Sequence, residues 1–254
     1  MNGVLLRHAA AELTGAAALV TTVVGSGIMA QRLSQDGAVQ LLANSTATVF
    51  GLAVLIAVFG PISGAHFNPV VSLADWWLGR RMGTGLSLPE VGVYAAAQTA
   101  GAIAGAVIAN LMFAIPAVTW SGTNRTGTHL WLGEVVATAG LLVVIVGLVR
   151  GGRTAAIPAA VGAYIGAAYW FTSSTSFANP AVTIGRAFTD TYAGIAPASV
   201  PGFIAAQLVG LLAALGLIAV FHPAGPAETA AVTAMSDVDD NRVAEKEPEH
   251  TAAR

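Results

Sequence analysis

The sequence contains no cysteine and few charged residues. The lack of cysteine excludes disulfide bridges, thiol catalysis and cysteine-ligated metals. Only 9% of the 254 residues are charged, whereas a soluble domain carries about 25%. Hydrophobic residues make up 55% of the chain, which is the composition of a membrane protein. The sequence also has no basic patch, so we expect no nucleic-acid partner.

The few acidic residues are unevenly placed. Seven of the 13 follow His222: Glu228, Asp237, Asp239, Asp240, Glu245, Glu247 and Glu249. A polar, acidic segment of this kind does not bury enough apolar surface to fold alone. We therefore expect a membrane domain over residues 1–222 and a disordered acidic tail over residues 223–254.

Long apolar runs predict an all-α membrane protein. A helix crosses a bilayer with about 20 apolar residues. The first run follows Arg7 and is long enough to span, so we interpret it as a retained helix and not as a signal peptide. We expect six spans, at residues 9–31, 38–60, 91–114, 131–149, 155–175 and 201–221. Two more apolar pieces, 64–78 and 177–188, are too short to cross alone.

Basic residues in the short loops indicate the orientation. With the N-terminus inside, five arginines lie in inner segments and three in outer ones: Arg7, Arg80, Arg81, Arg150 and Arg153 against Arg32, Arg125 and Arg186. Because basic residues favour the cytoplasmic side, we expect both termini in the cytoplasm and the protein in the cell membrane.

Three short motifs recur in the same order in the two halves of the chain. Glu12, Asn68-Pro69 and Gln98 are followed by Glu134, Asn179-Pro180 and Gln207, at offsets of 122 (134 − 12), 111 (179 − 68) and 109 (207 − 98). Each half has three expected spans, and an odd number makes the second half enter the membrane from the opposite side. We therefore expect inverted repeats over about residues 8–114 and 131–221, as in many transport proteins.

The two Asn-Pro pairs predict helix starts inside the membrane. Asparagine is a favoured N-cap, and proline suits the first helical position. Irregular backbone at this depth is tolerated where it is buried in protein or lines a watery cavity. We expect half-helices at 69–78 and 180–188, each about 15 Å long, meeting tip to tip at the midplane. Two helix N-termini facing one point repel cations, and the asparagine amides donate to a passing oxygen.

These features resemble the aquaporin (major intrinsic protein) family over about residues 8–221. The resemblance is carried by the boxes Asn68-Pro69-Val70 and Asn179-Pro180-Ala181, the Ala-Glu-x-x-Gly motif around Glu12, and Ser-Gly-Ala-His before the first box. It implies six tilted helices and two half-helices, assembled as a homotetramer with one pore per subunit. It also implies conduction of water, glycerol and similar neutral solutes, with no cofactor and no enzymatic activity.

The resemblance further implies a filter of four residues on the outer side of the boxes: Thr48, Ala167, Ser176 and Val182. Val182 stands where the family normally has arginine. Because the other positions are small and show no aromatic wall, we expect a wide, weakly selective constriction. Such filters resemble those of bacterial members linked to arsenic resistance, which pass arsenite as As(OH)3. In an alternative that the sequence leaves open, Arg186 or Arg125 replaces the missing cation.

Two acids within expected spans, Glu12 and Glu134, allow two interpretations. An intramembrane acid can relay protons, which suits a proton-coupled carrier or an ion-conducting channel. Alternatively each carboxylate accepts hydrogen bonds from a re-entrant loop, with Gln98 and Gln207 in a similar role. Their placement, one in each repeat, favours support of the loops. A membrane enzyme is not indicated, because the five histidines form no catalytic cluster in the sequence, and we expect His66 to pack under its loop.

Overall fold

All regular secondary structure in the computed structural model, which describes residues 3–80 and 82–221, is helical. Six helices are long and apolar enough to cross a membrane, so the chain is a multi-pass membrane protein. They are α1 (Gly3–Leu33), α2 (Gly37–Ser63), α4 (Leu88–Met112), α5 (Thr128–Arg150), α6 (Ile157–Phe171, preceded by a 3-10 turn at Thr154–Ala156) and α8 (Val200–Phe221). The expected six spans are confirmed, whereas the expected tail at 223–254 lies outside the described residues.

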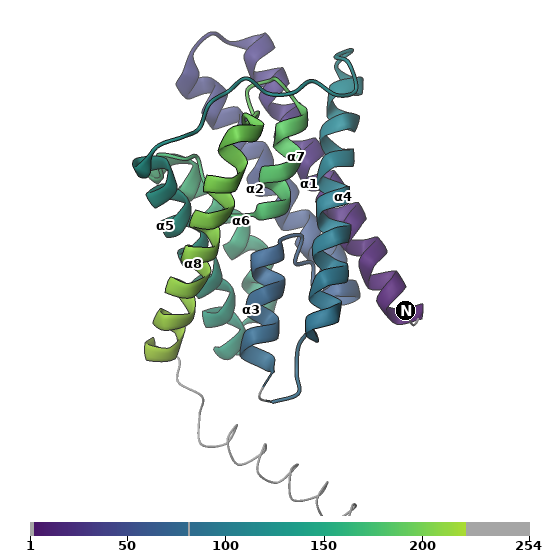
Figure 1. Ribbon diagram of the computed structural model, residues 1–254, viewed down its shortest axis with the longest axis vertical. Coiled ribbons are helices and arrows are strands. Elements are labelled where there is room, and N and C mark those ends of the chain that lie inside the picture. Colours follow the sequence, from purple (N-terminus) through teal and green to yellow (C-terminus); the bar gives the residue numbers. More distant parts are fainter. Residues whose placement is uncertain (1–2, 81, 222–254) are drawn as a thin grey trace, which may run out of the picture.

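Two short helices lie between the spans. Helix α3 covers Pro69–Gly79, and α7 covers Pro180–Gly185 and continues as a 3-10 turn at Arg186–Phe188. They run toward opposite ends of the bundle (Figure 1), so the fold is the expected set of six helices and two half-helices. The second half-helix differs from the expected continuous 180–188 helix, because its last turn tightens to 3-10 geometry.

Equivalent helices of the two halves pack in the same way. Helix α1 lies against α4, and α5 lies against α8. A Cβ atom on Gly101 of α4 would lie 2.2 Å from the Leu13 carbonyl oxygen of α1. A Cβ on Gly210 of α8 would lie 2.8 Å from the Val135 carbonyl oxygen of α5. Both pairs therefore approach closely through a glycine, as small residues allow in lipid.

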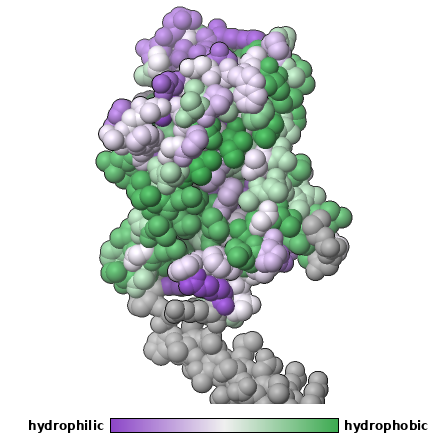
Figure 2. Space-filling view, in the orientation of Figure 1, coloured by the Kyte–Doolittle hydropathy of each residue, from purple (hydrophilic) through white to green (hydrophobic). Residues whose placement is uncertain are grey.

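The outer surface of the bundle is apolar. Large hydrophobic side chains are exposed along the spans, among them Phe50, Val58, Leu212 and Val220. Figure 2 shows a hydrophobic band across the helices, with hydrophilic residues gathered toward the ends. Helix α1 begins and α8 ends at one end of the bundle, here called the terminal end (Figure 1). The loops after α1, α4 and α7 lie at the opposite end.

Candidate functional site

The two asparagines begin the half-helices, as their Asn-Pro sequence predicts. The Asn68 side-chain oxygen accepts a hydrogen bond from the Val70 amide at 3.1 Å. The Asn179 oxygen accepts from the Ala181 and Val182 amides at 3.0 and 3.2 Å. Each residue has extended backbone and is followed by proline at the first helical position. The N-terminus of each half-helix is therefore capped by the side chain of its own asparagine.

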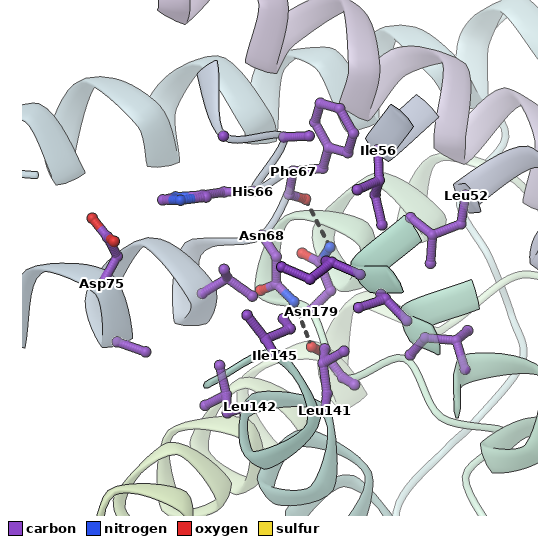
Figure 3. Close-up of a pocket in the computed structure, with 18 of the residues that line it drawn as sticks. Leu52, Ile56, His66, Phe67, Asn68, Asp75, Leu141, Leu142, Ile145 and Asn179 are labelled. Atoms are coloured by element: carbon purple, nitrogen blue, oxygen red, sulfur yellow. Dashed lines mark hydrogen bonds between the residues drawn. The ribbon is translucent and has the colours of Figure 1, made fainter. Parts of the chain in front are cut away.

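The same asparagines join the two loops to each other. The Asn68 amide nitrogen donates to the Ala178 carbonyl oxygen at 2.7 Å, and the Asn179 amide nitrogen donates to the Phe67 carbonyl oxygen at 2.8 Å (Figure 3). These reciprocal bonds hold the tips of α3 and α7 together. Each amide has a second N–H, and both asparagines line a cavity. A solute passing the junction meets two fixed donors.

Both re-entrant loops have the same unusual backbone. Positive φ angles occur at equivalent positions 111 residues apart: Gly64 (87°), Ala65 (50°) and Phe67 (49°), and Thr175 (61°), Ser176 (51°) and Ala178 (49°). Only the first of these six residues is glycine, and the left-handed conformation is costly for the others. The surrounding structure must therefore hold each loop in place.

Glu12 and Glu134 provide that support. The Glu12 carboxylate accepts hydrogen bonds from the Ser63 hydroxyl, the His66 and Phe67 amides and the Gln98 side chain, at 2.6 to 3.0 Å. The Glu134 carboxylate accepts from the Phe177 and Ala178 amides at 2.8 Å and from the Gln207 side chain at 2.6 Å. Each acid takes up loop amides that would otherwise be buried without partners.

The two glutamines extend the support to the half-helices. The Gln98 amide nitrogen also donates to the Ser72 hydroxyl of α3 at 3.1 Å. The Gln207 amide nitrogen donates to the Thr183 hydroxyl of α7 at 2.9 Å. All four carboxyl and amide side chains are fully buried, and none of the four belongs to the lining of the cavity described next. This arrangement supports a structural role for Glu12 and Glu134 over a proton relay along the lumen.

A cavity of about 360 Å³ lies beside the junction of the half-helices. One side of its wall carries the asparagine amides. The other side is apolar and is formed mainly by α2, α5 and α6, with Leu52, Ile56, Leu141, Leu142 and Ile145 among the lining residues (Figure 3). The lining continues past the junction in both directions, to Asp75 and His66 in the half nearer the terminal end and to Arg186 in the other half.

The half of the cavity away from the terminal end contains three of the four expected filter residues. Thr48, Ser176 and Val182 all line it and are buried. The Thr48 hydroxyl bonds to the Asn44 carbonyl oxygen at 2.8 Å. The Ser176 hydroxyl is buried and has no hydrogen-bond partner. This part of the wall therefore combines two small polar residues with an apolar Val182.

The placement of the fourth filter residue is corrected. Ala167 is exposed on the outside of α6, and Tyr169 lines the cavity instead, with its hydroxyl 3.3 Å from the Thr48 hydroxyl. Two residues correspond to about 200° around a helix, so Ala167 and Tyr169 face opposite sides. The expectation of a wall without aromatic residues is therefore wrong at Tyr169. Val161 and Ile165 also line the cavity, and this four-residue spacing is the signal that would have identified Tyr169.

Both arginines of the open alternative lie near Phe177. The Arg186 Nε atom donates to the Ala193 carbonyl oxygen, and its guanidinium carbon is 3.4 Å from the centre of the Phe177 ring. The Arg125 Nε atom donates to the Gly194 carbonyl oxygen at 2.8 Å, and its guanidinium carbon is 5.2 Å from the same ring. Arg186 lines the cavity, whereas Arg125 does not line it and belongs to the loop after α4. Burial lowers the pKa of Arg125, because desolvation penalises its charged form.

Two half-helices that meet beside a lumen within a six-span bundle define a membrane channel with re-entrant loops. Comparisons with known proteins agree. Residues 2–178 match the family model described as Major intrinsic protein. The chain is 49% identical over 223 residues to aquaglyceroporin AqpS of Rhizobium meliloti (strain 1021), across 87% of this chain and 93% of that protein. It is 31% identical over 195 residues to a probable TIP-type aquaporin of Medicago truncatula, across 72% and 75% of the two chains.

The fold is also that of a solved structure. The X-ray structure of the aquaglyceroporin from Plasmodium falciparum superposes with a TM-score of 0.63 at 21% sequence identity, across 84% of this chain and 95% of that chain. The chain belongs to the major intrinsic protein family. It is a channel for small neutral solutes and not an enzyme.

Proposed function

We propose that the channel passes neutral polyhydroxylated solutes, namely glycerol-like polyols and arsenite as As(OH)3, together with water. The observation that carries the proposal is Val182 in the cavity wall, at the position where the family normally has arginine. Valine takes up less of the lumen than arginine and offers no N–H group to a solute. A constriction bordered by valine is wider, so solutes larger than water can pass.

The two-sided wall supports this solute class. A polyol presents hydroxyl groups to the polar side, where Asn68 and Asn179 offer N–H donors, and C–H groups to the apolar side at Leu52 and Ile56. As(OH)3 is neutral and also carries three hydroxyl groups. Passing solutes therefore replace part of their hydration at the wall.

The position of the intramembrane acids supports a passive channel over a proton-coupled carrier or an ion-conducting channel. Either alternative needs charged or titratable groups along the route at mid-depth. Glu12 and Glu134 lie outside the cavity lining and are occupied by four and three hydrogen-bond donors, respectively. The residues that face the solute at the junction are neutral amides.

We further propose that the terminal end faces the cytoplasm in the cell membrane and that four copies assemble, each with its own pore. The orientation follows from the five inner arginines against three outer ones. The assembly follows from membership of the family. Protease protection of a tag at either terminus in sealed vesicles tests the orientation, and the mass of the detergent-solubilised protein by light scattering tests the assembly.

Stopped-flow light scattering on reconstituted vesicles tests the solute class. Wild-type vesicles are expected to re-swell in gradients of glycerol and of arsenite much faster than empty vesicles. Val182→Arg is expected to lower both rates by roughly tenfold and to spare part of the water flux, because it narrows the lumen and adds charge. Val182→Leu is the matched control, since it adds bulk without charge. Wild-type vesicles as slow as empty ones would overturn the proposal, and unchanged solute rates in Val182→Arg would overturn the filter assignment.

A further inference from the structure

We infer that Arg186 supplies the cation barrier that the family's filter arginine otherwise provides. In this channel one residue, Val182, then sets the width of the lumen, and another, Arg186, supplies the positive charge. The inference rests on the proposed function, because it needs a lumen open to neutral solutes. Arg186 follows Val182 by four residues, about one helical turn. Both residues line the same cavity. A valine therefore borders the constriction while an arginine stands one turn nearer the mouth.

The Arg186 side chain is held in the wall. Only 3% of the residue is exposed. Its Nε atom donates to the Ala193 carbonyl oxygen, and its guanidinium carbon lies 3.4 Å from the centre of the Phe177 ring. Phe177 is itself fixed, because its amide donates to Glu134 at 2.8 Å and its ring packs against Phe203 at 5.0 Å. Hence the charge stays beside the lumen and does not swing away into solvent.

The contacts of Arg186 leave its charge in place. A carbonyl oxygen and an aromatic ring both attract a guanidinium, but neither carries a formal charge. Arg125 approaches the same ring, which adds a second cation nearby. The Nε donor of Arg186 is used by the Ala193 carbonyl oxygen, and the residue lines the cavity in this position. The mouth of the cavity is therefore electropositive.

This charge acts at the constriction although it stands one turn away. One turn of helix is about 5.4 Å, which is shorter than the Debye length of about 8 Å at physiological salt. The apolar wall screens less than water does, so repulsion of a cation at Val182 persists. A neutral solute experiences no such repulsion. Moving the arginine one turn toward the mouth thus keeps cations out and leaves the lumen wide.

Sodium influx into the same vesicles used for glycerol tests the inference. Arg186→Met removes the charge with a side chain of similar length and is expected to raise sodium influx by about tenfold or more relative to the glycerol flux of the same vesicles. Arg32→Met is the matched control: this arginine lies at the same end, bonds to the Phe113 carbonyl oxygen, and does not line the cavity. It is expected to stay as tight to sodium as wild type.

Arg186→His distinguishes an effect of charge from an effect of side-chain structure, because its charge changes with pH while the side chain stays the same. Histidine has a reference pKa of about 6.5, which burial and the nearby Arg125 lower, so this variant is expected to leak at about pH 8 and to leak less as the pH is lowered toward about 4. The inference is overturned by Arg186→Met vesicles that pass glycerol but no more sodium than wild type, or by a leak of Arg186→His that does not change between about pH 8 and about pH 4. If Arg186→Met does not reconstitute, the histidine variant decides. Absence of glycerol flux in wild type would instead contradict the proposed function.

Discussion

The two re-entrant loops share one supporting framework and differ in the residues that face the two mouths. Each loop is held by a glutamate and a glutamine, and each asparagine bonds to the opposite loop. By contrast, Asp75 and Arg186 occupy equivalent positions (186 − 75 = 111) and carry opposite charges. Both line the cavity, one in each half. The residues that hold the fold are repeated, and the residues that select the solute are not.

Even these opposite charges share one structural task. The Asp75 carboxylate accepts a hydrogen bond from the Leu86 amide at 2.7 Å, in the segment after α3. Arg186 donates to the Ala193 carbonyl oxygen, in the segment after α7. Each side chain therefore anchors the loop that follows its half-helix through a hydrogen bond to the loop backbone, Asp75 as acceptor and Arg186 as donor. An inverted repeat can therefore anchor its two loops with side chains of opposite charge.

The largest expected effect comes from removing a supporting acid. Glu12→Ala leaves four donors without a partner and Glu134→Ala leaves three, and each unsatisfied buried group costs about 1–3 kcal/mol. We expect both variants to lose several kcal/mol of stability by this estimate, with Glu12→Ala the worse. Thermal unfolding in detergent measures the difference. Glu90→Ala is the matched control, since its exposed carboxylate only caps α4 through Ser87.

If Glu12→Ala unfolds at the same temperature as Glu90→Ala, the shared framework is not what holds the loops. If Glu134→Ala unfolds at a lower temperature than Glu12→Ala, the number of hydrogen-bond donors to each carboxylate does not determine the loss of stability. The first result would remove the comparison between the loops, and the second would show that the two loops are supported by different means.

The framework could be predicted from sequence because its signals are local. An acid, an amide or an Asn-Pro pair inside an apolar run needs a buried partner, and its recurrence in order marks the repeat. The resemblance places the filter position of α6 at Ala167 and not at Tyr169, because an irregular loop separates this helix from Asn179. Thr175, Ser176 and Ala178 in that loop have positive φ, so the helical register does not carry across it.

The contacts of Arg186 could not be predicted for a different reason. The sequence places it one turn beyond Val182, but its partners are a carbonyl seven residues later and a ring nine residues earlier. Such contacts depend on how the loop after α7 folds back. The sequence does contain one signal for this residue. The offset of 111 residues that relates Asn68 to Asn179 also relates Asp75 to Arg186, and it marks Arg186 as the counterpart of Asp75 in the second repeat.

The helix contacts of the two halves give a second, smaller effect. Gly101→Ala places a Cβ 2.2 Å from a carbonyl oxygen, whereas Gly210→Ala places it at 2.8 Å. Overpacking of this kind costs about 1–3 kcal/mol, so we expect both variants to unfold at lower temperature, Gly101→Ala at the lowest. Gly216→Ala is the matched control, because a Cβ there meets nothing within 4 Å. Greater damage from Gly210→Ala than from Gly101→Ala would show that backbone proximity does not rank the two interfaces.

Removal of the two asparagine N-caps is expected to give a smaller difference in stability between the two halves. Asn179 accepts from two helix amides and Asn68 from one, while each donates one bond to the opposite loop. Loss of a cap costs about 0.5–2 kcal/mol. We expect Asn179→Ala to lower the unfolding temperature slightly more than Asn68→Ala, and both to lower glycerol flux. Asn44→Ala removes a buried asparagine elsewhere, whose amide bonds to the Val23 carbonyl oxygen, and serves as the control for flux. Equal glycerol flux in all three variants would show that the two asparagines at the junction of the half-helices do not contribute to glycerol conduction.

The smallest effect tests whether the two mouths act together. Asp75→Asn removes the charge at one mouth but keeps an oxygen to accept from the Leu86 amide, so the loop after α3 stays anchored. A carboxylate at a mouth concentrates cations from solution. In the Arg186→Met background, Asp75→Asn should therefore lower sodium influx by about two- to threefold at low salt, and less at high salt, where screening weakens the attraction. An undiminished leak in the double variant would mean that the half-buried Asp75 carboxylate does not influence ions arriving at the lumen, and that the opposite charges of Asp75 and Arg186 serve only to anchor their loops.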